Sequence, residues 1–316
     1  MRILAVDDEE LVISLLKVVL PKLGYDQADF ASSGEEALSL IQRSKTPYDC
    51  VLSDIRMPGM DGVELCGHIR GLTDYVETPI IMLTSMVDRE YVDRSFGAGA
   101  TDYMNKPIRS EELDARLRVA QMQRREVRRL SAGALAGTEP AFALEDAITL
   151  NDVPGFISEI ALLNYLVQMS RINAFMHAAI GFQIEGVEAH YHRSRADDFK
   201  YMLECVAESI FGATRTVGVM ISYLGSGSFV AIVPRVNSFD QDSLNDVVEM
   251  ELDGLKIVDH VGKWRPVNVW SGPQINSRMF GGNPAELILR AVDAAREARS
   301  EELQRRESAI RQAITA

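Results

Sequence analysis

The chain has 316 residues, of which 47% are hydrophobic, and it carries a formal net charge of −13 at pH 7. This length and composition predict a globular protein of about two domains. The acidic balance argues against a protein that binds nucleic acid or an anionic membrane, because both partners need a basic surface. No apolar run approaches the roughly 20 residues of a membrane span, and residues 1–10 lack the apolar core of a signal peptide, so we expect a cytoplasmic protein.

Short apolar strands alternate with amphipathic helices in the first third of the chain. Strands are predicted at residues 2–6, 28–30, 50–53, 79–83 and 101–104. Apolar residues at helical spacing predict helices around residues 11–20 and 37–41, and over residues 62–72 and 88–96. This alternation predicts a five-stranded parallel sheet with helices on both faces.

The stretch from Val51 to Gly62 places one aspartate at the end of a predicted strand. The apolar run reaches Asp54, and the proline and glycines that follow prevent the strand from continuing. Other polar residues that follow predicted strands are Asp7, Asp8, Thr84 and Lys106. The carboxyl ends of parallel strands meet at one edge of the sheet, where α/β folds bind ligands, so we expect these side chains to converge.

Three carboxylates in one cleft repel one another, and a hard cation such as Mg²⁺ offsets that cost. The cluster of Asp7, Asp8 and Asp54 therefore predicts a metal site beside a phosphoryl group. Asp54 is the candidate nucleophile. The Lys106 ammonium and the metal would neutralise the transferring phosphoryl group, and the Thr84 hydroxyl would donate to one of its oxygens.

Four motifs, in this order, carry a resemblance to a known family. They are Val6-Asp7-Asp8, residues 53–62 (Ser-Asp-Ile-Arg-Met-Pro-Gly-Met-Asp-Gly), Leu83-Thr84-Ser85 and Asn105-Lys106-Pro107. Together they resemble the receiver domain of two-component response regulators, over residues 1–120. The resemblance implies a flavodoxin-like fold and the transfer of a phosphoryl group to Asp54 from a histidine kinase or a phosphotransfer protein.

The same resemblance assigns further roles. It implies that Mg²⁺ is held by Asp7, Asp8, Asp54 and the backbone carbonyl of Arg56. Tyr103 matches the switch aromatic of the family, which turns inward when Thr84 moves toward the phosphoryl group. The Lys106–Pro107 peptide bond is expected to be cis, as it is in the family.

A helix that begins at Ser110 is predicted to continue past the first domain, because apolar residues recur at helical spacing. That stripe consists of Leu113, Leu117, Ala120, Val127 and Leu130. Six arginines between Arg116 and Arg129 make the outer face basic. The helix is either a solvated stalk or a stalk through which two copies pair as a homodimer. We divide the chain into a receiver domain at 1–120, a helical stalk and linker at 121–144, and an output domain at 145–316.

From about residue 145 the chain again alternates helices and strands. Helices are predicted at 156–172, 199–211 and 284–299, and strands at 178–184, 217–223, 229–233 and 267–270. The turn Gly225-Ser226-Gly227-Ser228 between two apolar strands predicts a β-hairpin. These elements predict a second α/β domain with a mainly antiparallel sheet, in which residues 190–192 lie in an extended segment or in a loop.

The second half resembles the GGDEF domain of diguanylate cyclases over residues 145–300. The resemblance is carried by the order of the elements and by residues 206–207, 224–230, 270–272 and 291–298. The family's chemistry needs a Gly-Gly turn followed by acidic metal ligands, and an aspartate on the first strand. Here Gly225-Ser226 is the turn, the acids are replaced by Gly227 and Ser228, and Gln183 stands at the strand aspartate. The resemblance therefore implies the fold without the catalytic chemistry.

Two other sites of that family are also altered. The guanine-contacting positions align with Tyr191 and His192, and the acid of the product-binding inhibitory site aligns with Val219. We therefore expect a response regulator that signals through an inactive domain, by dimerisation or by contact with an unknown output protein. Two alternatives stay open: a sensor that binds cyclic di-GMP or GTP through this domain, and an active diguanylate cyclase.

Overall fold

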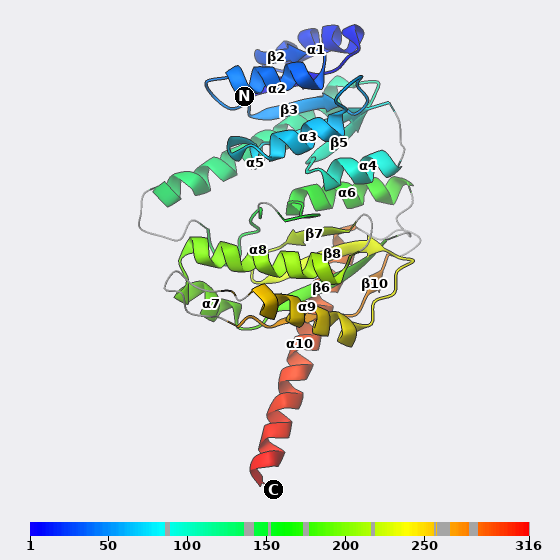
Figure 1. Ribbon diagram of the computed structural model, residues 1–316. Coiled ribbons are helices and arrows are strands. Elements are labelled where there is room, and N and C mark those ends of the chain that lie inside the picture. The colour runs from blue at the N-terminus through cyan, green and yellow to red at the C-terminus, as the bar shows by residue number, and fades with distance from the viewer. Residues whose placement is uncertain are drawn as a thin grey trace. The chain divides into compact units, whose positions relative to one another are not determined.

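The computed structural model divides into two compact units, Met1–Glu139 and Pro140–Ala316 (Figure 1). The structure describes residues 1–85, 89–135, 142–150, 153–172, 177–215, 219–255, 257, 266–277 and 284–315. Each unit contains its own sheet and its own hydrophobic core. The two units are therefore treated separately.

The first unit contains the predicted five-stranded parallel sheet. Its strands are β1 (Arg2–Val6), β2 (Gln27–Ala31), β3 (Cys50–Asp54), β4 (Ile80–Thr84) and β5 (Asp102–Asn105), in the order β2-β1-β3-β4-β5. The helices are α1 (Glu10–Lys22), α2 (Gly34–Arg43), α3 (Gly62–Arg70), α4 (Arg89–Gly97) and α5 (Ser110–Leu135), with a short 3-10 helix at Thr73–Tyr75. Every residue of β3 and β4 is buried, as expected for central strands covered on both faces.

Helix α5 is longer than one domain needs, as the sequence predicted. The first three residues of the predicted stripe, Leu113, Leu117 and Ala120, belong to the core cluster of the first unit, which also contains Leu16 of α1. The first part of the stripe therefore packs in the core of the first unit. The side chains of Val127 and Leu130 lie outside the described residues, so pairing of two copies through this helix stays a prediction.

The second unit contains the expected antiparallel sheet. Its strands are β6 (His177–Ile184), β7 (Met220–Tyr223), β8 (Ser228–Pro234), β9 (Val269–Ser271) and β10 (Ile275–Asn276). They run in the order β10-β6-β8-β7, with β9 also paired to β6. The predicted hairpin is confirmed as β7 and β8, with Tyr223 opposite Phe229.

The helices of the second unit are α6 (Glu159–Ile172), α7 (Val187–Arg193), α8 (Ala196–Ala213), α9 (Gln241–Leu255) and α10 (Pro284–Thr315). Helices α8 and α9 contribute side chains to the core cluster of this unit. Helix α10 packs on the sheet at its beginning and then continues beyond it (Figure 1). The described part of the chain contains no helix that is both long and apolar enough to cross a membrane.

Two helices of the second unit differ from the sequence-based expectation. Residues 190–192 were expected in an extended segment or in a loop, but they lie in helix α7. That prediction is wrong because Val187 and Tyr191, four residues apart, both turn toward the core. Helix α9 was not predicted, although Leu244, Val248 and Leu252 recur every four residues and are buried.

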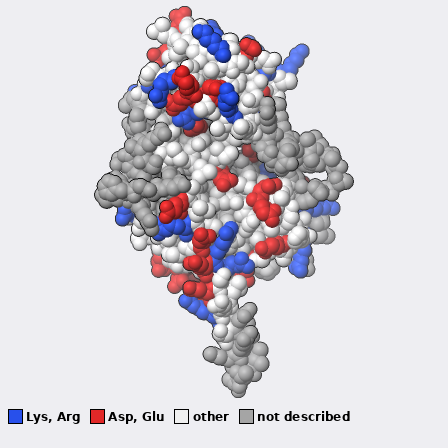
Figure 2. All heavy atoms as spheres, turned by 180° about the vertical axis from the view of Figure 1, so that it is seen from behind, with Lys and Arg blue, Asp and Glu red and all other residues white. Residues whose placement is uncertain are grey.

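Figure 2 shows one face of the molecule, on which acidic and basic side chains are interspersed with uncharged surface. No continuous basic area covers the described residues of this face. That distribution agrees with the net charge of −13.

The loop after β3 depends on a glycine at position 62. A β-carbon there would lie 1.9 Å from the Asp54 carbonyl oxygen and 3.0 Å from the Ile55 α-carbon. The Gly62 amide also donates to the Ile55 carbonyl, at 2.9 Å, so the loop closes tightly. Asp61 then begins α3 with a capping box, in which its side chain accepts from the Glu64 amide.

We expect Gly62→Ala to destabilise the first unit by roughly 1–3 kcal/mol, because the loop must open to admit the methyl group. Gly67→Ala is the matched control: it lies in the same helix, and its β-carbon would meet nothing within 4 Å. The control should be neutral or stabilising by up to about 1 kcal/mol. Urea-dependent hydrogen exchange of the β3 amides measures the free energy of unfolding of the first unit in both variants. Equal stability of the two variants would contradict the expectation.

Candidate functional site

Three carboxylates converge at the carboxyl edge of the parallel sheet. Asp7 follows β1, Asp8 is next to it, and Asp54 ends β3. Because β1 and β3 pair in parallel with Val6 opposite Ser53, the two strands end side by side. Oxygen atoms of the three carboxylates lie within 4.8 Å of one another. Asp7 and Asp54 are buried, whereas Asp8 is exposed, so the cluster opens to solvent on one side.

Lys106 lies among these acids. Its Nζ is 2.9 Å from Asp7 Oδ2, 3.1 Å from Asp54 Oδ1 and 2.9 Å from Glu9 Oε1. The first two contacts were expected from the convergence of strand ends. The contact to Glu9 was missed, although this residue belongs to the same acidic turn after β1. The Lys106 ammonium therefore neutralises part of the negative charge of these carboxylates.

Burial raises the pKa values of the two buried acids, Asp7 and Asp54. It raises the pKa of Asp54 to about 6, although the nearby Lys106 ammonium lowers it. Burial likewise raises the pKa of Asp7, although the hydrogen bond from Lys106 lowers it. Burial alone would lower the pKa of Lys106, but Glu9, Asp7 and Asp54 outweigh it and raise that pKa. The site therefore holds more negative charge than one lysine can balance.

The donor set fits a hard divalent cation. Carboxylate oxygens within one short radius, partly open to solvent, are the ligands that Mg²⁺ takes in proteins. Asp7, Asp8 and Asp54 are the side chains that would hold it. Arg56 follows β3, and its guanidinium lies over the Tyr91 ring, 5.2 Å from the centroid. The role of its backbone carbonyl as a ligand stays a prediction.

Thr84 and Tyr103 lie on the two neighbouring strands. Thr84 ends β4 and is buried, and its carbonyl accepts from the Lys106 amide at 2.6 Å. The Lys106–Pro107 bond is cis, as expected. Tyr103, on β5, is buried and packs edge-to-face on Phe96 of α4 with ring centroids 6.4 Å apart. The tyrosine thus lies inward, and its role as a switch stays a prediction.

In the second unit, the structure brings together Gln183 of β6 and Ser228 of β8. The Ser228 hydroxyl donates to Gln183 Oε1 at 2.8 Å, and Gln183 Nε2 donates to the Ser226 carbonyl at 3.0 Å. Arg296 of α10 joins them: its guanidinium donates to the Ser228 hydroxyl at 3.0 Å and to Gln183 Oε1 at 3.3 Å. We call these three side chains the amide–guanidinium cluster. It is a closed network that includes a positive charge.

Two backbone amides of the turn before Ser228 also donate hydrogen bonds within the unit. The Ser226 amide donates to the Leu144 carbonyl at 2.7 Å, and the Gly227 amide donates to the Tyr223 hydroxyl at 3.2 Å. Glu185, two residues after Gln183 and just beyond the end of β6, accepts from the Trp270 indole at 3.0 Å. The backbone donors and the carboxylate of this region are thus engaged inside the unit.

The other positions of the second unit that the resemblance singled out are Tyr191, His192 and Val219. Tyr191 donates its hydroxyl to the Phe142 carbonyl at 2.7 Å, whereas His192 is exposed on the same helix. Val219 is buried in the core of the unit. None of these three residues supplies a carboxylate.

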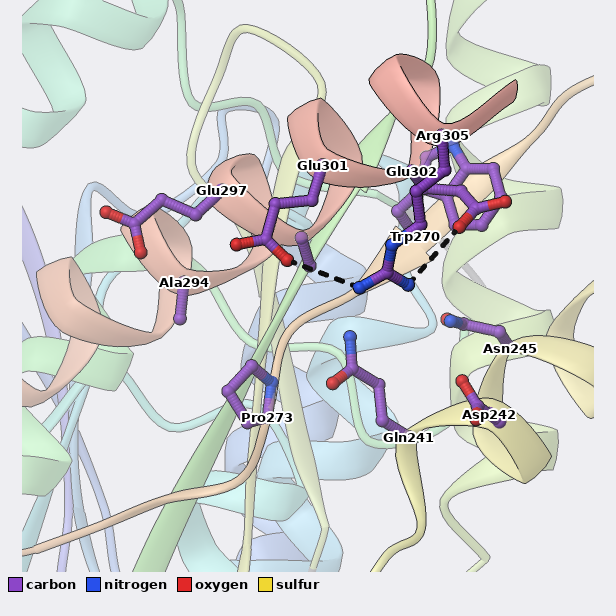
Figure 3. A pocket seen from close by; sticks show the side chains of 11 residues that line it. Gln241, Asp242, Asn245, Trp270, Pro273, Ala294, Glu297, Glu301, Glu302 and Arg305 are labelled. Carbon is purple, nitrogen blue, oxygen red and sulfur yellow. Dashed lines mark ion pairs between the residues drawn. The ribbon is translucent and has the colours of Figure 1, made fainter. Parts of the chain in front are cut away.

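A pocket of about 310 Å³ lies elsewhere in the second unit, between α9, β9 and α10 (Figure 3). Trp270 lines it together with several acidic side chains, and Arg305 lies 3.8 Å from both Glu301 and Glu302. None of the residues that the sequence singled out as site positions lines this pocket. The pocket is therefore a feature that the sequence reasoning did not anticipate.

Comparisons with known proteins agree with the geometry of the first unit. Residues 3–118 match the family model of the response regulator receiver domain. The two-component response regulator ARR10 of Arabidopsis thaliana is 38% identical over 113 residues, which cover 36% of this chain and 20% of that protein. The alkaline phosphatase synthesis transcriptional regulatory protein PhoP of Bacillus subtilis (strain 168) is 40% identical over 119 residues, which cover 37% of this chain and 47% of that protein.

A similar solved structure is that of the chemotaxis protein CheY4 of Vibrio cholerae. It is 33% identical, and the match covers 97% of that chain and 38% of this one, with a TM-score of 0.36. The family match and the curated relatives place the first unit in the class of signalling domains that are phosphorylated on an aspartate. The chain carries a receiver domain of the two-component response regulators. It spans less than half the length of the two curated relatives named above, and the family match ends at residue 118.

Replacing Lys106 by methionine should raise the pKa of Asp54 further above its ordinary range, because the ammonium that favours the ionised carboxylate is lost. Carbon-13 NMR titration of the carboxyl carbons in the presence of a chelator measures this pKa. Arg109→Met is the matched control, since this exposed cation pairs with Glu112. The same Asp54 pKa in both variants would show that Lys106 does not govern the cluster.

Proposed function

We propose that this protein is a cytoplasmic response regulator of a phosphorelay, which accepts a phosphoryl group on Asp54 from a histidine kinase or a phosphotransfer protein. The observation that carries this proposal is the position of Lys106 Nζ, 3.1 Å from Asp54 Oδ1 and 2.9 Å from Asp7 Oδ2. An ammonium in that place can neutralise charge on a phosphoryl group as it reaches Asp54.

The proposed reaction is a displacement at phosphorus. An Asp54 carboxylate oxygen forms a bond to the phosphorus atom, and the bond to the donor imidazole breaks, so the imidazole leaves with the electron pair. A pKa of about 6 leaves Asp54 mostly ionised, and thus nucleophilic, at pH 7. The Thr84 hydroxyl would donate to a phosphoryl oxygen. Mg²⁺, held by Asp7, Asp8, Asp54 and the Arg56 carbonyl, would supply additional charge neutralisation.

The proposed readout of phosphorylation passes through Thr84 and Tyr103. Movement of Thr84 toward the phosphoryl group would vacate space at the end of β4. Tyr103 lies on the neighbouring strand, with Met82 of β4 opposite it. A change in the position of its ring would alter the surface near α4, because the ring packs on Phe96 of that helix.

The proposed output is an inactive GGDEF-like domain that acts by protein contact or by dimerisation. We assign the receiver to residues 1–120, the stalk and linker to 121–144 and the output domain to 145–316. The amide–guanidinium cluster supports inactivity. Its neutral side chains, Gln183 and Ser228, stand where that family places metal-binding acids, and the Arg296 guanidinium within 3.3 Å of both would repel a divalent cation.

Asp54→Asn should abolish transfer of a phosphoryl group from acetyl phosphate in the presence of Mg²⁺, because an amide lacks the nucleophilic oxygen anion. Intact-protein mass spectrometry measures the added phosphoryl group. Asp26→Asn, which changes an exposed aspartate of the same unit, should be phosphorylated like the original protein. Retained phosphorylation of the Asp54 variant would place the acceptor at another residue.

The full-length protein, activated by beryllofluoride and mixed with GTP and Mg²⁺, should form no cyclic dinucleotide above the background without protein. The reason is the absence of a carboxylate from the amide–guanidinium cluster. Chromatography of the reaction mixture measures the product, with an active diguanylate cyclase as the positive control. Formation of a cyclic dinucleotide from GTP would establish an active diguanylate cyclase. Micromolar binding of GTP or cyclic di-GMP in calorimetry, without turnover, would favour the sensor.

A further inference from the structure

Residues 142–146, which we call the strap, lie against the hairpin turn of the second unit. The Leu144 carbonyl accepts from the Ser226 amide at 2.7 Å. The Phe142 carbonyl accepts from the Tyr191 hydroxyl at 2.7 Å. Within the strap, the Ala143 amide donates to the Asp146 side chain at 2.7 Å. The strap is thus a short folded segment that is attached to the rest of the unit through its backbone.

One aromatic side chain adds to this attachment. The Phe142 ring lies 6.1 Å from the Phe199 ring and 6.4 Å from the Tyr191 ring, and the latter two rings are 5.3 Å apart. Phe142 remains partly exposed, whereas Phe199 is buried in the core. Phe142 and Leu144 are partly buried and pack against the core cluster, so the strap covers the outer surface of that cluster at Tyr191 and Phe199.

The hairpin turn is shaped for this contact. Gly225, Ser226 and Gly227 all have positive φ angles, of 83°, 50° and 72°. A β-carbon on Gly225 would lie 2.1 Å from the Glu145 carbonyl oxygen, so glycine allows the strap to approach. Ser226 holds a left-handed conformation that non-glycine residues seldom adopt, and in that conformation its amide bonds to the strap. The conformation of the turn and the position of the strap are therefore coupled.

We infer that the strap is a displaceable cover over a docking surface made of the Ser226 amide and the rings of Tyr191 and Phe199. The inference rests on the proposed function, because the state of the receiver would control the cover. The strap precedes the helices and the sheet of the second unit in the chain, so a change that is transmitted along the chain from the receiver reaches the strap before it reaches the sheet.

The chemistry of the covered surface defines its partner. A displaced strap uncovers one backbone donor and two aromatic rings. A segment of an output protein that offers a backbone carbonyl and one large apolar side chain, as Leu144 and Phe142 do now, would replace it. The strap thus acts as an internal competitor for an extended apolar peptide segment.

The test is hydrogen exchange of the full-length protein, with and without beryllofluoride and Mg²⁺. Beryllofluoride should accelerate exchange of residues 142–146 and of the amides at 225–227 together. Tyr191→Phe, which removes only the hydroxyl bond to Phe142, should accelerate exchange of the same amides about fivefold without beryllofluoride, the effect of one ordinary hydrogen bond. Phe142→Ala, a change in the strap itself, should do the same while the β6 and β8 amides keep their protection.

Tyr201→Phe is the matched control, because Tyr201 is an exposed tyrosine of α8 in the same unit. Unchanged strap exchange in both Tyr191→Phe and Phe142→Ala would overturn the inference. It would also be overturned if beryllofluoride protected the receiver around Asp54 and Thr84 but left the strap unaffected, and the proposed phosphoacceptor function would then survive. No response of the receiver to beryllofluoride would overturn both.

Discussion

The first unit depends on the balance between buried carboxylates and one ammonium at the edge of its sheet. Removing Asp7 and Asp54 from water disfavours their charged forms, and the contacts of Lys106 with both acids offset part of that cost. The balance requires β1, β3 and β5 to end at the same level, because each supplies one of the three groups. The tight loop closed by Gly62 helps to fix the end of β3.

The convergence of Asp7, Asp8, Asp54 and Lys106 could be predicted from the sequence for a physical reason. Each participating residue follows a short apolar strand, and the parallel sheet brings strand ends together whatever the intervening helices contain. The contact of Glu9 with Lys106 was not predicted, because the position of a strand end determines the location of only the first residues of the turn that follows it. Its carboxylate reaches Lys106 through the conformation of the turn, which residue spacing does not encode. The inward position of the Tyr103 ring likewise depends on Phe96, from a different element.

The second unit was harder to predict because its important contacts join distant segments. The sequence singled out Gln183 and Ser228 as residues that replace acids, but it offered no reason to connect them with Arg296, which lies 113 residues after Gln183. Helix α7 was missed since its seven residues hold few apolar positions, of which Val187 and Tyr191 face the core. Short helices of this kind are specified by packing more than by local propensity.

The polar side chains near the strand ends differ between the two units. Those of the first unit keep an excess of negative charge, whereas those of the second unit bond to one another. The first unit leaves an excess of negative charge that a cation and a phosphoryl group can modify. In the second unit, Gln183, Ser228 and Arg296 satisfy one another, so a small ion or phosphate gains little by entering. In the proposed function, a signal from the first unit would therefore reach the second through the position of chain segments rather than through a shared ligand. The strap, held by backbone hydrogen bonds and by the packing of Phe142 and Leu144, is the segment that we infer to move.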